Sequence, residues 1–137
     1  MIAAAACAGS LWIAIALNFY HYDDDQNPYV YTQTYRTFFG LYNEIQRYSN
    51  SRHDGGQTAI SVLSPDYWPM PWYFRHDTQI GYFGRIPDKV PYVTRMIIIS
   101  DTQQTQVLPL LGNGFVLQGK YPLRPGVVLD VYVRDFE

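Results

Sequence analysis

The first stretch of the chain is apolar throughout, and the pattern of apolar and polar positions changes sharply after it. Residues 1–17 are interrupted only by Gly9 and Ser10, and they show no polar face. A helix that is apolar on all sides is buried deeply or lies in lipid, and about 17 residues is the lower limit for crossing a bilayer. A secretory signal would begin with Lys or Arg, which this segment lacks. We therefore expect residues 1–19 to be the end of a transmembrane helix.

The residues after this segment indicate on which side of the membrane the chain emerges. Aromatic side chains at 19, 20 and 22 are typical of the membrane–water interface, and aspartates follow at 23–25. No Lys or Arg occurs before Arg36, so the positive-inside rule favours an extracytoplasmic exit. The pattern predicts a protein of the cell membrane, with an acidic linker at residues 20–28 and an extracytoplasmic domain at residues 29–137.

The rest of the pattern predicts an α/β domain. Residues 34–50 carry apolar side chains at helical spacing, with Thr34 as the expected cap. Short apolar or β-branched runs predict strands at residues 27–34, 58–64, 78–84, 94–100 and 127–136. The run at 94–100 is typical of a strand covered on both faces, and the last run alternates, as an edge or antiparallel strand would. Residues 104–112 fit a short helix or an irregular turn, because Pro109 opposes a long helix. These elements predict a small α/β sandwich with a mixed sheet.

The composition narrows the classes of function. Charged residues make up 16% and aromatic residues 17% of the chain, and the formal net charge is −2. A nucleic-acid-binding protein would have a basic patch, or Lys and Arg interleaved with its aromatic residues, so we expect no nucleic-acid partner. Such a surface favours contact with a protein, a membrane interface or a sugar. The histidines at 21, 53 and 76 lack the spacing of a metal site, and no motif predicts a cofactor.

The segment SPDYWPMPWYFR, residues 64–75, is the most unusual part of the sequence. Pro69 and Pro71 remove two backbone donors, so the segment cannot be a central strand. It predicts one short helical turn beginning near Pro69, with Asp66 capping the amides that follow. Because Trp68 precedes this turn, we expect it to be the more buried indole, and Trp72 to lie at the rim.

Two interpretations of this segment stay open. The aromatic side chains could close the core over the sheet, with Arg75 pairing with Asp66 or Asp77. They could instead form a platform for a sugar ring or a polyprenyl chain, or a docking face for a membrane domain. Arg124, in YPLRPG, is expected to pair with an acidic neighbour, with a phosphate as the alternative partner. The candidate ligand or interface residues are Asp66, Tyr67, Trp68, Trp72, Tyr73, Arg75 and Arg124.

Other polar residues at strand ends are weaker candidates. Ser64 and Ser100 each end an apolar run, but neither has the Gly-x-Ser-x-Gly surroundings of a hydrolase nucleophile. Asp66 and Asp101 could form a carboxylate pair if their strands are neighbours. Capping of the turns that follow explains both carboxylates more simply. No residue is therefore predicted to be catalytic.

Three stretches carry a resemblance to a known family. SPDYWPMPWYFR, TQIGYFG and GKYPLRPGVVLDVYVRD resemble the C-terminal extracytoplasmic domain of a prokaryotic family of multi-pass membrane glycosyltransferases. That family is related to the dolichyl-phosphate-mannose–protein mannosyltransferases (glycosyltransferase family 39-like) and includes the flippase-activity-associated proteins of archaeal glycosylation. The resemblance runs from the end of the apolar helix to Asp135. Its members use a lipid-phosphate-linked sugar as donor, and their catalytic acidic residue lies in an early external loop between membrane helices.

No segment of this chain matches that catalytic loop. The resemblance therefore implies a non-catalytic extracytoplasmic domain of a membrane glycosyltransferase, which helps to position the acceptor or the lipid carrier. Its implied partners are the membrane, the multi-pass transferase domain of the same or an adjacent protein, and a lipid-linked sugar or glycan acceptor. The alternative is a membrane-anchored carbohydrate-binding module without an enzymatic partner domain. That alternative requires Trp68 or Trp72 to be exposed.

Overall fold

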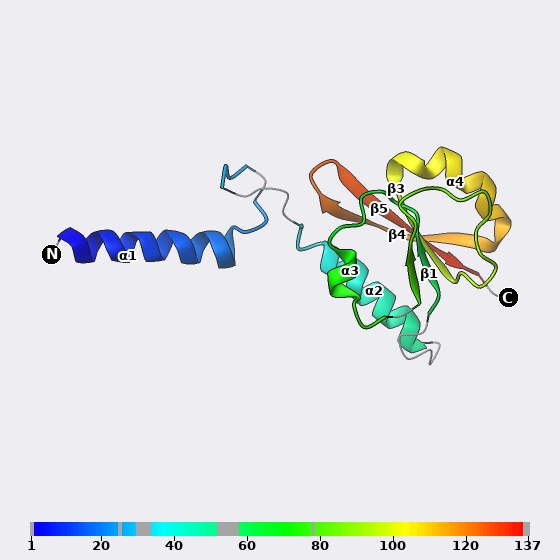
Figure 1. The fold of residues 1–137 in the computed structure, drawn as a ribbon, viewed down its shortest axis with the longest axis horizontal. Helices are drawn as coiled ribbons and strands as arrows, with labels where there is room; N and C mark the ends of the chain where they lie inside the picture. The colour runs from blue at the N-terminus through cyan, green and yellow to red at the C-terminus, as the bar shows by residue number, and fades with distance from the viewer. Residues whose placement is uncertain (1, 25, 30–33, 52–57, 78, 136–137) are drawn as a thin grey trace.

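The computed structural model describes residues 2–24, 26–29, 34–51, 58–77 and 79–135 (Figure 1). It begins with an α-helix, α1 (Ile2–Ile15), which continues as the π-helix η1 (Ala16–Tyr20). The two together are long and apolar enough to cross a membrane, and none of their residues is buried against the rest of the chain. In Figure 1 this helix projects away from the α/β domain. Its length and composition fit a membrane span or a signal sequence equally well.

The domain after it contains helices and strands in the following order. The elements are α2 (Phe38–Ser51), β1 (Ile60–Val62), α3 (Met70–Tyr73), β2 (Ile80–Tyr82), β3 (Met96–Ser100), η2 (Asp101–Gln103), α4 (Gln104–Leu111), η3 (Gly112–Gly114), β4 (Phe115–Arg124) and β5 (Val127–Arg134). The described strands form one five-stranded sheet in the order β2-β1-β3-β5-β4. β1 runs parallel to β2 and β3, whereas β5 runs antiparallel to β3 and β4. The predicted α/β fold with a mixed sheet is confirmed.

The central strand β3 divides the core between the two faces of the sheet. All five of its residues are buried, as expected for a strand covered on both faces. Because side chains alternate along a strand, Met96 and Ile98 join the core beneath α2 and α3, and Ile97 and Ile99 join the core beneath α4. The sheet is therefore the middle layer, with α2 and α3 on one face and α4 on the other (Figure 1).

Several details differ from the sequence-based expectations. Helix α2 begins at Phe38, so Thr34 is not its cap. The backbone before the helix is bound to β4 instead: the Tyr35 amide donates to the Leu123 carbonyl at 2.9 Å, and the Thr37 hydroxyl donates to the Pro122 carbonyl at 3.0 Å. Residues 30–33 of the strand expected at residues 27–34 lie outside the described residues, and residues 27–29 and 34 form no strand.

Strand β4 was not predicted from the sequence. Gly119 and Pro122 interrupt its pattern, and its pairing with β5 shifts register twice. An edge strand tolerates proline because one side of its backbone has no neighbour. The last predicted strand, now β5, is antiparallel as expected but lies inside the sheet. Of the two structures considered for residues 104–112, a short helix or an irregular turn, the short helix is present: it is α4, and it contains Pro109.

Candidate functional site

The aromatic–proline segment forms a single helical turn on the α2 face of the sheet. As predicted, the turn starts just after Pro69, and α3 spans Met70–Tyr73. The Met70 amide donates to the Tyr67 carbonyl at 2.8 Å, and the Phe74 amide donates to the Met70 carbonyl at 3.0 Å. Met70 and Phe74 lie one turn apart and are both buried in the core. They fix the turn on the sheet, and Trp72, between them, faces outward.

The two tryptophans of the segment are both exposed. Trp68 and Trp72 each expose 63% of their surface, so the expectation that Trp68 is the more buried indole is wrong. The places in the core next to the turn are filled by Met70 and Phe74, which leaves both indoles outside. The exposure that a sugar-binding platform or a docking face requires is therefore present at both positions.

The side chain of Arg124, at the end of β4, binds the first residues of the segment. Its guanidinium donates to the Asp66 carboxylate at 2.6 Å and to the Trp68 carbonyl at 3.2 Å. The expected pairing of Arg124 with an acidic neighbour is thus confirmed. The Asp66 amide in turn donates to the Ser64 hydroxyl at 3.1 Å. The backbone that carries Trp68 is held by a side chain of β4, while its indole stays free of the core.

Arg75 has a different partner from those expected. Its guanidinium lies 5.1 Å from the centre of the Trp72 ring and donates to the Trp72 carbonyl at 3.0 Å. Neither of the expected ion pairs, with Asp66 or with Asp77, occurs among the described contacts. A guanidinium stacked on an exposed indole presents a cation and an apolar face side by side.

The tyrosines of the segment close the core, as one of the two interpretations proposed. The ring of Tyr67 lies 5.3 Å from that of Tyr82, and the ring of Tyr73 lies 5.1 Å from that of Phe38. Tyr73 also meets Phe39 edge-on at 5.5 Å. The segment therefore has two parts: tyrosines that pack against the domain, and tryptophans that do not.

The segment lies at the end of the domain where the chain enters from α1. Arg36 donates to the Tyr20 carbonyl at 2.7 Å and to the Asp23 carboxylate at 3.1 Å, and its guanidinium lies 4.7 Å from the centre of the Tyr22 ring. The residues on either side of Arg36 are bound to β4 just before Arg124. A continuous set of contacts thus leads from the end of the apolar helix to the tryptophans.

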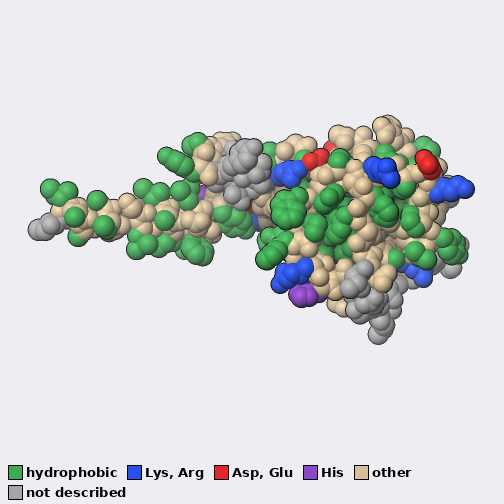
Figure 2. Space-filling model, viewed as in Figure 1, with side chains coloured by type: hydrophobic (Ala, Val, Ile, Leu, Met, Phe, Trp, Pro, Cys, Tyr) green, Lys and Arg blue, Asp and Glu red, His purple; other side chains and the backbone are tan. Residues whose placement is uncertain are grey.

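Exposed apolar residues lie at this end of the domain. Figure 2 shows hydrophobic side chains gathered on the end of the domain that is nearest to α1, with Lys and Arg side chains around them. Phe39 and Phe83 add to the exposed apolar area, at 41% and 44% exposure. We call Trp68, Trp72, Phe39 and the stacked Arg75 the aromatic end of the domain. It offers stacking surfaces and cationic donors, which suit sugar rings, lipid headgroups or another protein.

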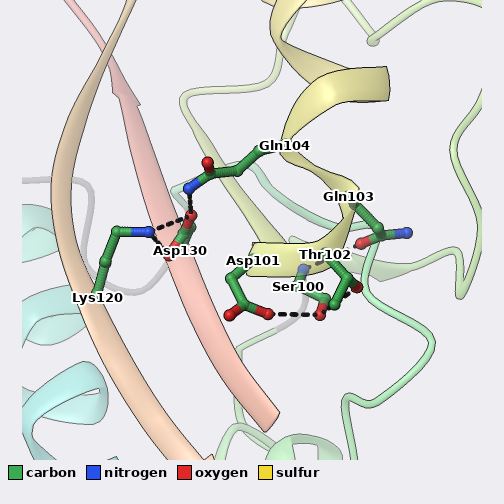
Figure 3. Close-up of polar contacts among 7 residues, drawn as sticks. All are labelled: Ser100, Asp101, Thr102, Gln103, Gln104, Lys120 and Asp130. Carbon is green, nitrogen blue, oxygen red and sulfur yellow. Dashed lines mark hydrogen bonds and ion pairs between the residues drawn. The ribbon is translucent and has the colours of Figure 1, made fainter.

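A second polar cluster lies at the end of β3 (Figure 3). Asp130, on β5, is fully buried, and both of its oxygens accept hydrogen bonds from Lys120 at 2.9 Å. Gln104, at the start of α4, also donates to Asp130. The bond with Asp130 raises the pKa of Lys120. Because every group in this cluster has a partner, it serves to hold α4 and β4 on the sheet.

The strand-end residues Ser100 and Asp101 have local partners as well. The Ser100 amide donates to the Gln103 side chain at 3.0 Å, and its hydroxyl contacts Thr102 at 3.0 Å and Asp101 at 3.4 Å (Figure 3). Asp66 is bound to Arg124, and no described contact joins it to Asp101. The capping role expected for Asp101 is wrong, because Ser100 is the N-cap of η2, in a capping box with Gln103, and Asp101 lies inside the turn. The capping expected of Asp66 is wrong as well, because no side chain caps α3 and Asp66 binds Arg124 instead. Among the described residues, no group of three or more His, Cys, Asp and Glu side chains could hold a metal ion.

No family model, no curated protein and no solved structure matches this chain. The class of protein that the fold and the site define is an α/β domain with an apolar N-terminal helix and an exposed aromatic end.

Proposed function

We propose that this chain is a non-catalytic extracytoplasmic domain of a membrane glycosyltransferase that uses a lipid-phosphate-linked sugar. Its aromatic end faces the membrane and helps to position the acceptor or the lipid carrier. The observation that carries this proposal is the exposure of Trp68 and Trp72 at the end of the domain bound to the apolar helix. The resemblance of residues 64–75, 78–84 and 119–135 to such transferases supports the choice of reaction.

The chemistry of the aromatic end supports a carrier or acceptor as its ligand. A lipid-linked sugar combines an apolar chain, phosphate groups and a sugar ring. Indole faces pack against the chain or the ring, and Arg75, stacked on Trp72, is placed to meet a phosphate. The bonds from Arg124 to Asp66 and to the Trp68 carbonyl keep this surface in one conformation. Less conformational entropy is therefore lost when a ligand binds.

The second candidate is a carbohydrate-binding module on a single membrane anchor, without an enzymatic partner domain. The same exposure of both indoles favours it, because sugar-binding platforms use exposed aromatic rings. The two candidates differ in the ligand: the module binds a free glycan, whereas the transferase domain requires the lipid-linked form or the membrane domain.

Fluorescence of single-tryptophan variants separates the two candidates. The chain has three tryptophans, so each can be kept alone by changing the other two to Phe. The full chain is reconstituted in vesicles of brominated phosphatidylcholine, with or without dolichyl phosphate mannose. We expect the bilayer to quench Trp12, and the lipid-linked sugar to change the emission of Trp68 and Trp72. A response to free mannose alone favours the module, and no response to either ligand refutes both candidates.

A labelling experiment tests the side of the membrane. The variant Lys89→Cys, in a Cys7→Ser background, places a single thiol on an exposed residue of the domain. In intact cells, a membrane-impermeant maleimide should label this thiol. Labelling that requires lysis of the cells would place the domain in the cytoplasm and refute the proposed topology.

A further inference from the structure

A hollow of about 290 Å³ lies at the other end of β5 from the aromatic end. It is lined by Tyr92, Val93, Arg95 and Arg134. Arg134 is the last residue of β5, and the turn that follows Arg124 precedes the first. Eight strand residues rise by about 3.3 Å each, so the two ends are roughly 23 Å apart. The hollow is therefore separate from the surface discussed above.

The guanidinium of Arg134 is held in this hollow by aromatic rings. It lies 5.4 Å from the centre of the Tyr92 ring and 4.8 Å from that of Phe115. Its Nε is buried, and no acceptor among the described residues bonds to it. No ion pair of Arg134 occurs in the described part of the chain either. The ring contacts thus fix the Arg134 guanidinium in place. Its positive charge is available to a ligand that enters the hollow.

Arg95 is the second arginine that lines the hollow. The Arg134 amide donates to the Arg95 carbonyl at 2.8 Å, so the two residues are backbone neighbours and both line the hollow. Arginine binds carboxylate and phosphate through paired hydrogen bonds, so the Arg134 guanidinium in this hollow favours an oxyanion as its ligand. A planar guanidinium that ring contacts already hold loses little freedom when it forms such bonds.

The other wall of the hollow is apolar and open. Tyr92 exposes 89% and Val93 exposes 69% of its surface. An exposed tyrosine ring beside a cation is suited to stack on the apolar face of a sugar ring. The volume is at the lower limit of ligand pockets, which span about 300–1,000 Å³, so one ring fits better than a longer chain.

We propose that this hollow binds a single sugar residue that carries a carboxylate or a phosphate group. Arg134 binds the oxyanion, Arg95 lies beside it, and Tyr92 stacks on the ring. This inference is independent of the proposed function, because it requires neither the membrane nor a partner domain. It assigns an acidic glycan or sugar phosphate to the end of the domain away from the apolar helix.

Calorimetric titration of the full chain in detergent micelles tests the proposal with four probes. These are glucuronate, glucose 6-phosphate, glucose and acetate. We expect both acidic sugars to bind, with glucose and acetate each about tenfold weaker or more, because each lacks one of the two contacts. The tighter of the two acidic sugars identifies the oxyanion. Binding of acetate as tight as that of glucuronate would show an adventitious anion only and would overturn the proposal.

Variants locate the binding in the hollow. Arg134→Gln should weaken glucuronate binding about tenfold or more, and Tyr92→Ala should weaken it about threefold to tenfold. Tyr92 is almost fully exposed, so its loss leaves the fold intact even if Arg134→Gln disturbs β5. Arg85→Gln removes a charge from an exposed residue outside the hollow and should change nothing. Equal affinity of Tyr92→Ala and the original chain would refute the stacking role, and with it the assignment to this hollow.

Discussion

Arg124 and Asp66 lie 58 residues apart in the sequence, yet their side chains form an ion pair of 2.6 Å. The same guanidinium binds the Trp68 carbonyl, so this one side chain ties the end of β4 to the start of the aromatic segment. The pair is partly shielded, with 24% of the Arg124 side chain and 42% of the Asp66 side chain exposed. These two contacts fix the position of the Trp68 backbone.

The first prediction concerns this pair. In a double-mutant cycle of Arg124→Ala and Asp66→Ala, we expect a coupling free energy of about 1 kcal/mol, the upper end for partly exposed pairs. Arg124→Ala should cost more alone than Asp66→Ala, because it also removes the bond to Trp68. Urea denaturation in detergent micelles, followed by circular dichroism, measures both. The pair of Glu44 with the exposed Arg47, three residues apart on α2, is the control, and its coupling should be weaker than that of Arg124 and Asp66. A coupling no larger than the control would refute the bracing role.

The second prediction separates the two parts of the aromatic segment. Trp68→Ala and Trp72→Ala should each lower the free energy of unfolding by less than about 1 kcal/mol, because both indoles are mostly exposed. Met70→Ala, between them, should lower it by about 2–5 kcal/mol, because Met70 is fully buried. Denaturation curves of the three variants provide the comparison. A tryptophan variant as unstable as Met70→Ala would show that the indole belongs to the core.

The third prediction uses a buried hydroxyl. The Tyr82 hydroxyl is buried, and no partner for it is found among the described residues. Burial, with a smaller contribution from Asp77, raises the pKa of Tyr82 far above its ordinary value. At pH 7, Tyr82→Phe should leave stability unchanged or raise it by up to about 1 kcal/mol, because it removes an unpaired polar group.

The pH dependence of the same variant has a definite sign. The unfolded chain loses the Tyr82 proton above about pH 10, while the folded chain keeps it, so stability is complete below pH 10 and falls above it. The loss is at most about 1.4 kcal/mol per pH unit, and Tyr82→Phe should lack this contribution. Denaturation between pH 8 and pH 11 measures the difference. Tyr92→Phe, at an exposed ring, is the control, and an equal slope in both variants would contradict the prediction.

The core elements could be predicted because their patterns are local. The run Met96–Ile99 is continuous and apolar, which by itself predicts a strand buried on both faces. The prolines at 69 and 71 likewise restrict the backbone wherever the segment lies, so a short helical turn followed from the sequence. Strand β4 was missed because its pattern is broken by Gly119 and Pro122, and its pairing depends on β5.

The orientation of the tryptophans could not be read from local spacing. Whether an indole is buried depends on which other side chains fill the space over the sheet. Met70 and Phe74 fill that space, so neither indole is buried there. The partner expected for Arg75 was wrong for the same reason, because the exposed Trp72 ring is available to its guanidinium and no described ion pair joins Arg75 to Asp66 or Asp77. One signal was present but not used: Asp130 stands among apolar residues in the run VVLDVYV, where a charge is rarely buried without a partner.

The last prediction concerns that buried carboxylate. Asp130 is fully buried, and Lys120 supplies its cation while exposing 49% of its own side chain. Lys120→Ala leaves the carboxylate with Gln104 alone, so we expect the free energy of unfolding to fall by about 1–3 kcal/mol, less than for a fully buried pair. Replacing both residues, as Lys120→Met with Asp130→Leu, should recover most of this loss, because no buried charge remains. Lys89→Ala, at an exposed lysine, is the control.

The pH dependence of this pair provides an independent check. The pKa of Lys120 is raised by its bond to Asp130, so the folded chain holds the Lys120 proton more tightly than the unfolded chain does. The stabilisation is therefore complete below the ordinary lysine value of about 10.5 and is lost as the pH rises through the folded value. Lys120→Ala should be less stable than the original chain at pH 7 and should approach it above pH 11. A constant difference in stability across this pH range would contradict the prediction. It would mean that Lys120 stabilises the fold by packing of its apolar stem, and not by the charge that it places beside Asp130.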